Sequence, residues 1–430
     1  MKNICERVYK NVALLQGKVA IALSGGADSM CLMSILCAMP ERNFDLAVIN
    51  VEHGIRGEES IADSDFVRDY ATKQGLAYRQ VNVDVPKYAL ENKVSYETAG
   101  RILRYRAFDE ALSDGFADYI CLAHHLDDLC ETVLMRIFRG TGLDGLKGIQ
   151  SRDRFIRPLL ECTRKEIDEY VSEHNIPYRQ DQTNFESDYT RNYLRNVVLP
   201  AVESKWTDYR ESILKLSVRA KENEEFLTSI APRFSIDGSC VYLKIDELKS
   251  VDRVLQKHAV RQAVKTLNGG VDFEEKNLED VLSFLSAKNG ARLDLADKIK
   301  VWKEYDKLVF ERFTESKSES TPFKVGVFDF AGEKWVIRKR TDETVRFDLR
   351  KIPENAVIRP RKDGDKFTKF GGKQMSLGDF YTEKKVPKRL RDRFPVIAVG
   401  NTVLVTPVEI SDLVRVDDEQ TIAYVLKKSE

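Results

Sequence analysis

The 430-residue chain balances 69 Lys and Arg against 69 Asp and Glu, and it is 42% hydrophobic and 32% charged. This composition excludes a disordered chain, a collagen-like repeat and a membrane bundle. No apolar run reaches the roughly 18 residues of a spanning helix, the N-terminus lacks a signal-peptide pattern, and seven irregularly spaced cysteines fit reduced thiols. We therefore expect a cytoplasmic protein of about three domains with no membrane partner.

The first part of the chain alternates apolar strands with amphipathic helices. We expect strands at residues 19–23, 45–51, 77–83 and 118–123, and helices at 28–38, 60–74 and 99–113. A further helix should begin at Thr163, because TRKE has the Thr-x-x-Glu pattern of a capping box. This alternation predicts an α/β domain at residues 1–205, with a Rossmann-like parallel sheet covered on both faces. In such a sheet, ligands bind beyond the carboxyl ends of the strands.

The rest of the chain has a different pattern. Residues 206–313 predict a helical middle domain, with helices at 209–230, 246–267 and 273–287 and a hairpin at 293–310. Residues 314–322 are polar and serine-rich, which is typical of a linker. Residues 323–430 should form a small mixed α+β domain. Within it, residues 351–393 hold thirteen Lys and Arg but six Asp and Glu, a net charge of +7. Such a stretch is either a solvated face or a surface for a polyanion.

The sequence SGGADS directly follows the first expected strand. Its paired glycines permit a tight turn whose N–H groups can face an anion, and the following helix N-terminus adds partial positive charge. We expect phosphate oxygens to bind at Ser24, Gly25, Gly26, Ala27, Asp28 and Ser29. Asp28 would repel a bare phosphate, so its expected role is to bind Mg²⁺. The alternative is an ordinary strand-to-helix turn, and the missing Walker A lysine disfavours kinase-type or GTPase-type chemistry.

The sequence HHLDDLCET follows the fourth expected strand and should reach the same edge of the sheet. It contributes four titratable side chains, His124, His125, Asp128 and Glu131. A zinc site is one alternative, because these are zinc-ligand types, although the spacing matches no common zinc signature and no cysteine pair accompanies it. Polar residues at a strand end are the other alternative.

Together these motifs resemble the PP-loop, or N-type, ATP pyrophosphatases, which cleave ATP to AMP and pyrophosphate. The wider set resembles the tRNA(Ile)-lysidine synthetase family in particular. The shared segments are EHGIRGEES, with His53 and Arg56; TAGRILRYRAF, with Arg101 and Arg104; HHLDDLCET; GTGLDGLKGI; RFIRPLL; and DQTNFESDYTRNYLRN. The segment GDKFTKFGGKQMSLGDFYTEKKVPKRLRDRFPVI resembles that family's closing domain. The middle third of the chain resembles that family only in its helical character.

The resemblance implies a ligase that uses ATP and Mg²⁺ and acts on an isoleucine tRNA with a CAU anticodon. The wobble cytidine would be adenylated on its C2 oxygen, and free L-lysine would then displace AMP to form lysidine. Asp28 and Asp128 would hold the metal. The residues expected to handle lysine or the base are His53, Arg56, Arg101, Arg104, His124, His125, Asp128 and Glu131. A homodimer is compatible with this interpretation.

Two polar-basic groups are expected to contact the tRNA. The first comprises Asp181, Thr183, Asn184, Arg191, Asn192 and Arg195. The second comprises Lys369, Lys373, Lys384, Lys385, Lys388 and Arg389. The aromatic residues interleaved with the second group, Phe367, Phe370, Phe380 and Tyr381, should mostly lie in the core. For both groups the alternative is a charged surface that packs against a neighbouring part of the chain or faces solvent.

Two other functions stay open from the sequence. Another PP-loop enzyme that modifies tRNA bases would use similar ATP chemistry; a thiolase of this kind needs a cysteine pair or iron–sulfur ligands, and the chain has no C-x-x-C. A catalytically inactive tRNA-binding module is the second alternative, and the intact Asp28, Asp128 and Glu131 argue against it.

Overall fold

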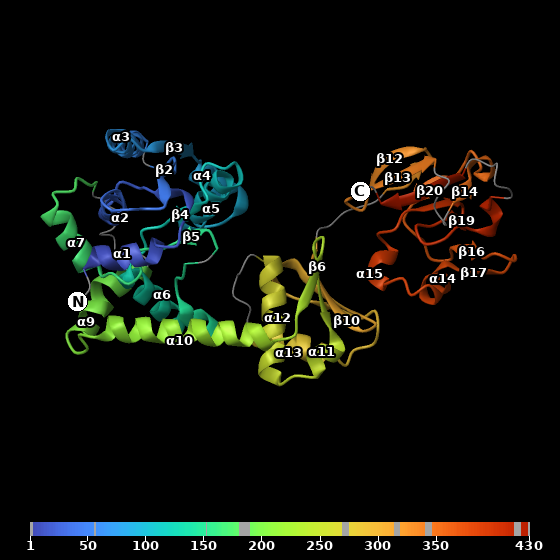
Figure 1. Cartoon of the computed structure of the whole chain (residues 1–430). Coiled ribbons are helices and arrows are strands. Elements are labelled where there is room, and N and C mark those ends of the chain that lie inside the picture. Colours follow the sequence, from blue (N-terminus) through green and yellow to red (C-terminus); the bar gives the residue numbers. More distant parts are fainter. Residues whose placement is uncertain are drawn as a thin grey trace. The chain divides into compact units, whose positions relative to one another are not determined.

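The computed structural model describes residues 3–55, 57–151, 153–179, 190–268, 275–313, 319–339, 346–416 and 423–428. The chain divides into two compact units, Met1–Phe226 and Leu227–Glu430. The first unit contains the whole expected α/β domain and residues 206–226 of the expected middle domain, including most of one long helix. The second unit contains the rest of that middle domain and the expected C-terminal domain (Figure 1). Within the described ranges, no helix is long and apolar enough to cross a membrane.

The first unit is built on a five-stranded sheet in the order β3-β2-β1-β4-β5. All neighbouring strands in it are parallel. The strands are β1 (Gly17–Ala22), β2 (Phe44–Glu52), β3 (Ala77–Asn82), β4 (Tyr119–Cys121) and β5 (Phe155–Ile156). The parallel sheet and its first four strands are confirmed, and β5 was not expected. Because the chain steps outward from β1 to β3 and then returns to β4, the strand order reverses between β1 and β4, where such sheets bind ligands.

Helices cover both faces of this sheet. The helices of this part of the chain are α1 (Ile4–Val12), α2 (Ala27–Cys37), α3 (Glu58–Lys73), α4 (Val85–Asn92), α5 (Tyr96–Ser113), α6 (Leu126–Arg139), α7 (Arg164–Glu173), α8 (Thr190–Tyr193), α9 (Leu199–Glu203) and α10 (Tyr209–Ile230). The helix expected at Thr163 is confirmed: α7 has a capping box made by Thr163 and Glu166. Neighbouring residues of β1 point to opposite faces, so Val19 joins one apolar core and Ala20 joins the other.

The beginning of the second unit is less helical than the sequence predicts. Its helices are α11 (Ile245–Lys249), α12 (Arg253–Asn268) and α13 (Glu275–Phe284). Its antiparallel sheet, in the order β6-β7-β10-β9-β8, consists of β6 (Phe234–Asp237), β7 (Cys240–Lys244), β8 (Arg292–Asp294), β9 (Ile299–Glu304) and β10 (Lys307–Arg312). The hairpin expected at residues 293–310 is present as β9 and β10, whereas β6 and β7 were missed because such short strands show too few alternations.

The end of the second unit is a mixed α+β structure, as predicted. One sheet has the order β11-β15-β18-β19-β16-β17, and the other has the order β12-β13-β20-β14. The elements are β11 (Thr321–Pro322), β12 (Gly326–Phe330), β13 (Glu333–Lys339), β14 (Phe347–Asp348), β15 (Val357–Arg359), β16 (Lys366–Thr368), β17 (Gln374–Ser376), α14 (Leu377–Glu383), α15 (Lys388–Arg391), β18 (Val396–Val399), β19 (Thr402–Val405) and β20 (Ala423–Lys428). The last residues of the expected linker therefore form β11, and residues 314–318 lie outside the described part of the chain.

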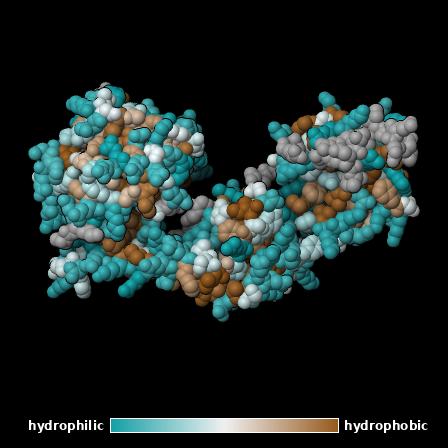
Figure 2. All heavy atoms as spheres, in the orientation of Figure 1, coloured by the Kyte–Doolittle hydropathy of each residue, from teal (hydrophilic) through white to brown (hydrophobic). Residues whose placement is uncertain are grey.

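The aromatic residues of the basic stretch are mostly core residues, as expected. Phe367, Phe380 and Tyr381 are fully buried, and the Phe367 and Phe380 rings stack 4.1 Å apart. Phe370 differs, because 46% of its surface is exposed. The face drawn in Figure 2 is largely hydrophilic with scattered apolar patches, which agrees with the high charged fraction of the sequence.

Candidate active site

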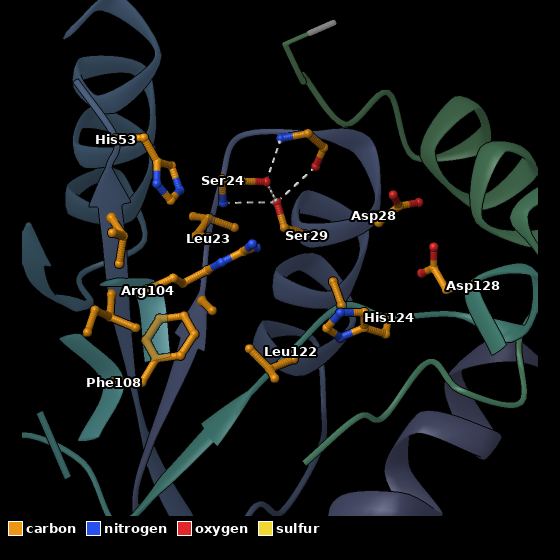
Figure 3. A pocket seen from close by; sticks show the side chains of 15 residues that line it. Leu23, Ser24, Asp28, Ser29, His53, Arg104, Phe108, Leu122, His124 and Asp128 are labelled. Carbon is orange, nitrogen blue, oxygen red and sulfur yellow. Dashed lines mark hydrogen bonds between the residues drawn. The ribbon is translucent and has the colours of Figure 1, made fainter. Parts of the chain in front are cut away.

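A cavity of about 220 Å³ opens at the carboxyl ends of β1 and β4. It is lined by the turn after β1, by the start of α6 after β4, and by side chains from β2 and α5. The polar residues around it are Ser24, Asp28, Ser29, His53, Arg104, His124 and Asp128 (Figure 3). The structure therefore brings both sequence motifs to one site, at the position where the strand order of the sheet reverses.

The turn after β1 is held in shape by two serine hydroxyls. The Ser29 hydroxyl donates to the Gly26 carbonyl at 3.0 Å and accepts from the Ser24 backbone N–H at 3.3 Å. The Ser24 hydroxyl lies 3.2 Å from that of Ser29 and accepts from the Gly26 N–H. Gly25 has φ +85°, and a Cβ there would lie 3.3 Å from Val67, so glycine suits this position. The turn leads into the N-terminus of α2, which makes it suitable for a phosphate group.

Two carboxylates meet beside this turn. Asp28 lies in the first turn of α2 and Asp128 in the first turn of α6, and they face one another in Figure 3. Nε2 of His125 lies 3.8 Å from Oδ1 of Asp28 and 3.6 Å from Oδ2 of Asp128. Nη1 of Arg164 donates to both oxygens of Asp28, each at 3.1 Å. Burial raises the pKa of Asp28, and His125 and Arg164 oppose this rise without cancelling it.

The two carboxylates fit a metal that arrives with phosphates. Burial alone would raise the pKa of Asp128, but His125, its neighbour His124 and Arg195 outweigh this effect and lower it. Among the described residues, no group of three or more His, Cys, Asp or Glu side chains could hold a metal. Mg²⁺ is commonly bound by one or two carboxylates together with substrate phosphates and water. Asp28 and Asp128, next to a phosphate-type turn, provide that kind of donor set.

Two neutral histidines form part of the cavity wall. Burial lowers the pKa of His53, and it lowers the pKa of His124 to about 4. Nδ1 of each ring is buried without a hydrogen-bond partner in the described part of the protein. Buried polar atoms are normally partnered, so these two nitrogens are exceptions among the described residues. Arg104 extends toward the same cavity (Figure 3), whereas Arg101 lies over the Tyr105 ring and does not line it.

A second cavity, of about 170 Å³, borders the carboxylate pair at His125. Its other polar lining residues are three carboxylates and three arginines, namely Asp127, Glu131, Glu203, Arg164, Arg195 and Arg210. Such a lining, with both charge signs close together, is suited to a small zwitterion.

Glu131 is fully buried behind this second cavity and is held by arginine. Nε of Arg195 donates to Oε1 of Glu131 at 2.6 Å, and its Nη2 donates to Oε2 at 3.1 Å and to Oδ1 of Asp128 at 3.3 Å. Nε of Arg191 lies 3.5 Å from Oε2 of Glu131. Burial raises the pKa of Glu131, although the Arg195 contact lowers it. Arg191 and Arg195, which were expected at the tRNA backbone, thus turn toward the active-site carboxylates.

Sequence reasoning missed Arg164, Asp127 and Arg210. The Arg164 backbone N–H donates to Oδ2 of Asp127 at 2.7 Å, and Nε of Arg210 donates to Oδ1 of Asp127 at 2.6 Å. Arg210 also pairs with Glu203. One available signal was the TRKE capping box, which places Arg164 at the first position of α7.

The remaining expected site residues have several different environments. Lys373, Lys385 and Lys388 are exposed and make no ion pair with a described residue, while Lys369 pairs with Glu383 and Lys384 pairs with Glu409. Asn192 is partly exposed. The expectation for Arg389 needs correction: this side chain is buried in ion pairs with Glu304 and Glu311, so it is not available to a tRNA phosphate. Residues outside the described ranges are Arg56, Asp181, Thr183 and Asn184.

Comparisons with known proteins show which families the chain is similar to. Residues 1–202 match a PP-loop domain, and residues 356–420 match the TilS substrate C-terminal domain. The chain is 32% identical over 414 residues to a tRNA(Ile)-lysidine synthase of Clostridium tetani, covering 90% of this chain and 88% of that protein. It is 30% identical to the Bacillus subtilis tRNA(Ile)-lysidine synthase, covering 92% and 90%. A solved U34-tRNA thiolase from Methanococcus maripaludis is 20% identical with a TM-score of 0.44, covering 51% of this chain and 78% of that one.

The Glu131–Arg195 pair predicts a large effect on stability. In Arg195→Met, the buried Glu131 carboxylate loses its two-point partner, and we expect the free energy of unfolding to fall by about 3 kcal/mol. Arg191→Met is the matched control, because Arg191 is about as exposed as Arg195 but makes only one longer contact with Glu131, at 3.5 Å; we expect a loss below about 1 kcal/mol. Urea unfolding followed by circular dichroism measures both variants. Equal losses would contradict the importance assigned to Arg195.

Proposed function

The chain belongs to the tRNA(Ile)-lysidine synthase family, and from this we propose how its residues divide the work of an ATP-dependent ligase that forms lysidine on tRNA. The substrates in this proposal are ATP, free L-lysine and an isoleucine tRNA with a CAU anticodon. The observation that carries it is the meeting of the SGGADS turn and Asp128 at one cavity, with both carboxylates beside His125.

In the first step, the C2 oxygen of the wobble cytidine attacks the α-phosphorus of ATP. An O–P bond forms, the bond to the β-phosphate breaks, and pyrophosphate leaves. The turn at Ser24–Ser29 would hold the phosphates through N–H and hydroxyl groups. Asp28 and Asp128 would hold Mg²⁺, which offsets the negative charge of the phosphates. His53, His124 and Arg104 line the cavity where the cytosine ring would lie.

In the second step, the lysine side-chain amine attacks C2 and AMP leaves, carrying the C2 oxygen with it. We assign the second cavity to lysine, because its carboxylates and guanidinium groups complement an ammonium and a carboxylate. The amine must be neutral to act as a nucleophile. Glu131 and His125 lie at this cavity and are the residues we assign to positioning or deprotonating lysine.

The tRNA would also contact the exposed lysines of the second unit. Lys373, Lys385 and Lys388 are exposed and make no ion pair with a described residue, although Lys369 and also Lys373 lower the pKa of Glu383. The charges of the three exposed lysines are therefore available to phosphates. Phosphate contacts of this kind orient the nucleic acid and do not read its sequence.

A single experiment tests the overall reaction. Purified protein is incubated with ATP, Mg²⁺, labelled lysine and total tRNA, and the labelled tRNA is identified by sequencing. We expect label in one isoleucine tRNA, together with release of pyrophosphate. Label in several tRNAs, or none, would contradict the proposed substrates.

The proposed metal ligands predict a specific loss. Asp28→Asn and Asp128→Asn should each lower pyrophosphate release by on the order of 10²–10³-fold or more, since they remove charge that faces the reacting phosphates. Binding of tRNA should change little. Asp45→Asn is the control, because Asp45 is exposed at the opposite end of β2. Near-normal turnover in either active-site variant would refute the metal assignment.

The proposed lysine site predicts that the two steps can be separated. With ATP and tRNA but no lysine, adenylated tRNA should accumulate. Glu131→Gln should then slow lysine transfer more than adenylate formation, because it alters the second cavity and not the phosphate turn. Mass spectrometry of the tRNA follows both products, and the exposed Glu169→Gln serves as control. Equal slowing of both steps would argue against a lysine-specific role for Glu131.

The exposed lysines predict a change in salt dependence. The triple variant Lys373→Gln, Lys385→Gln and Lys388→Gln should bind tRNA more weakly. Its slope of log affinity against log salt should fall by roughly 0.7–0.9 for each lost phosphate contact. Lys249→Gln with Lys276→Gln is the control, since these lysines are exposed elsewhere in the second unit. Filter binding at several salt concentrations measures the slope, and an unchanged slope would mean that these lysines face only solvent.

A further inference from the structure

Two arginines of the basic stretch are engaged in a buried cluster. The Arg389 cluster consists of Glu304 from β9, Glu311 from β10, Arg389 from α15, and Arg393. Nε of Arg389 donates to Oε1 of Glu304 at 2.9 Å, and its Nη1 lies 3.5 Å from Oε2 of Glu311. Arg393 donates to both oxygens of Glu311, at 2.8 and 3.1 Å. The cluster thus joins α15 to the antiparallel sheet formed earlier in the same unit.

Three of the four side chains of the cluster are buried, Arg393 is 30% exposed, and the charges balance. Exposed fractions of the side chains are 5% for Arg389, 3% for Glu304 and 2% for Glu311. Burial by itself would lower the pKa of Arg389, but the two carboxylates hold it above its usual value. The indole N–H of Trp302 also donates to Oε1 of Glu311 at 2.9 Å. Burying ion pairs contributes little net stability, whereas it can select one arrangement of the groups that it joins.

A backbone contact supports the same placement. Gly290, in the loop between α13 and β8, has φ +77°, and a Cβ built there would lie 3.4 Å from the Cβ of Lys388. The beginning of α15 therefore packs closely against this loop. Lys388 itself is exposed and directly precedes Arg389, and the exposed Lys385 lies three residues before Lys388.

We propose that Arg389 and Arg393 are positioning residues for tRNA binding, which seat α15 on Glu304 and Glu311 so that Lys385 and Lys388 are presented as a preformed phosphate-binding surface. This inference rests on the proposed role of these lysines. The physical reason is preorganisation: Lys388 on α15 and Lys385 in the turn before it lose less conformational freedom on binding when this segment is anchored than when it is not.

A comparison of two variants separates positioning from direct contact. Glu311→Gln retains the shape of the side chain but leaves two arginines against one carboxylate. It should raise both the Kd and the KM for tRNA roughly threefold to tenfold. The kcat at saturating tRNA and the salt slope should stay unchanged, because the phosphate contacts keep their number. Lys385→Gln with Lys388→Gln should instead reduce the slope by roughly 0.7–0.9 per lost contact.

Controls make the failures distinguishable. Glu383→Gln removes an exposed carboxylate that pairs with Lys369 outside the cluster, and it should leave tRNA affinity near normal. If the lysine variant leaves affinity and slope unchanged, the proposed tRNA surface is wrong and the inference falls with it. If the lysine variant behaves as expected but Glu311→Gln binds tRNA normally, or also lowers the slope, the positioning role alone is overturned.

Disulfide cross-linking tests, without tRNA, whether α15 packs against the loop at Gly290. Disulfides usually have Cβ atoms about 3.5–4.5 Å apart, and the 3.4 Å approach of Gly290 to Lys388 lies at the short end of this range. In the full chain, Gly290→Cys with Lys388→Cys should link on mild oxidation, as shown by mass spectrometry of the joined peptides. Each single cysteine variant controls for strain at Gly290 and for native thiols. Adding Glu304→Gln and Glu311→Gln should slow disulfide formation severalfold. If the disulfide does not form, or forms at the same rate with these two changes, the proposed placement of α15 by the cluster is overturned.

Discussion

The need to hold two carboxylates together beside the proposed phosphate site organises the first unit. Asp28 and Asp128 come from two different helices and both approach His125. Two like charges in a partly buried site repel one another and are stable there only when cations offset them. Arg164 supplies one cation and Arg195 the other. Both arginines follow β5, the last strand of this sheet, in the sequence. The site is therefore complete only when the segment after β5 has folded against α2 and α6.

Hydrogen bonds link the site to the helices that come after β5 in the sequence. The N–H of Arg164 and the guanidinium of Arg210 bind the two oxygens of Asp127, and Arg210 lies at the start of α10. Arg195 in turn covers the buried Glu131. The second cavity is therefore built from the same charged groups that balance the carboxylate pair, which places the proposed lysine site directly beside the proposed ATP site.

The second unit uses its arginines and lysines differently. Arg389 is buried between carboxylates, where a planar fork of donors can satisfy several acceptors at once. Lys373, Lys385 and Lys388 are exposed, where a flexible ammonium keeps its hydration and can follow a phosphate backbone. The local net charge of the basic stretch thus overstates how many of its cations can face a polyanion.

Local patterns in the sequence determined the parallel sheet, the phosphate turn and the pairing of SGGADS with HHLDDLCET at one edge. The strands and the turn depend on neighbours within a few residues, such as strand alternation and paired glycines. The two motifs could be placed together, although they are distant in sequence, because each directly follows a strand and ligands bind beyond the carboxyl ends of the strands of a parallel sheet. Only the tertiary structure decided which partner each charged side chain takes. Arg195 binds Glu131 across 64 residues and Arg389 binds Glu304 across 85, and local spacing carries no information about such distant contacts. The short strands β6 and β7 were likewise decided by pairing in the folded chain, where β6 pairs with β7 and β7 pairs with β10, because four or five residues are too few to show their own periodicity.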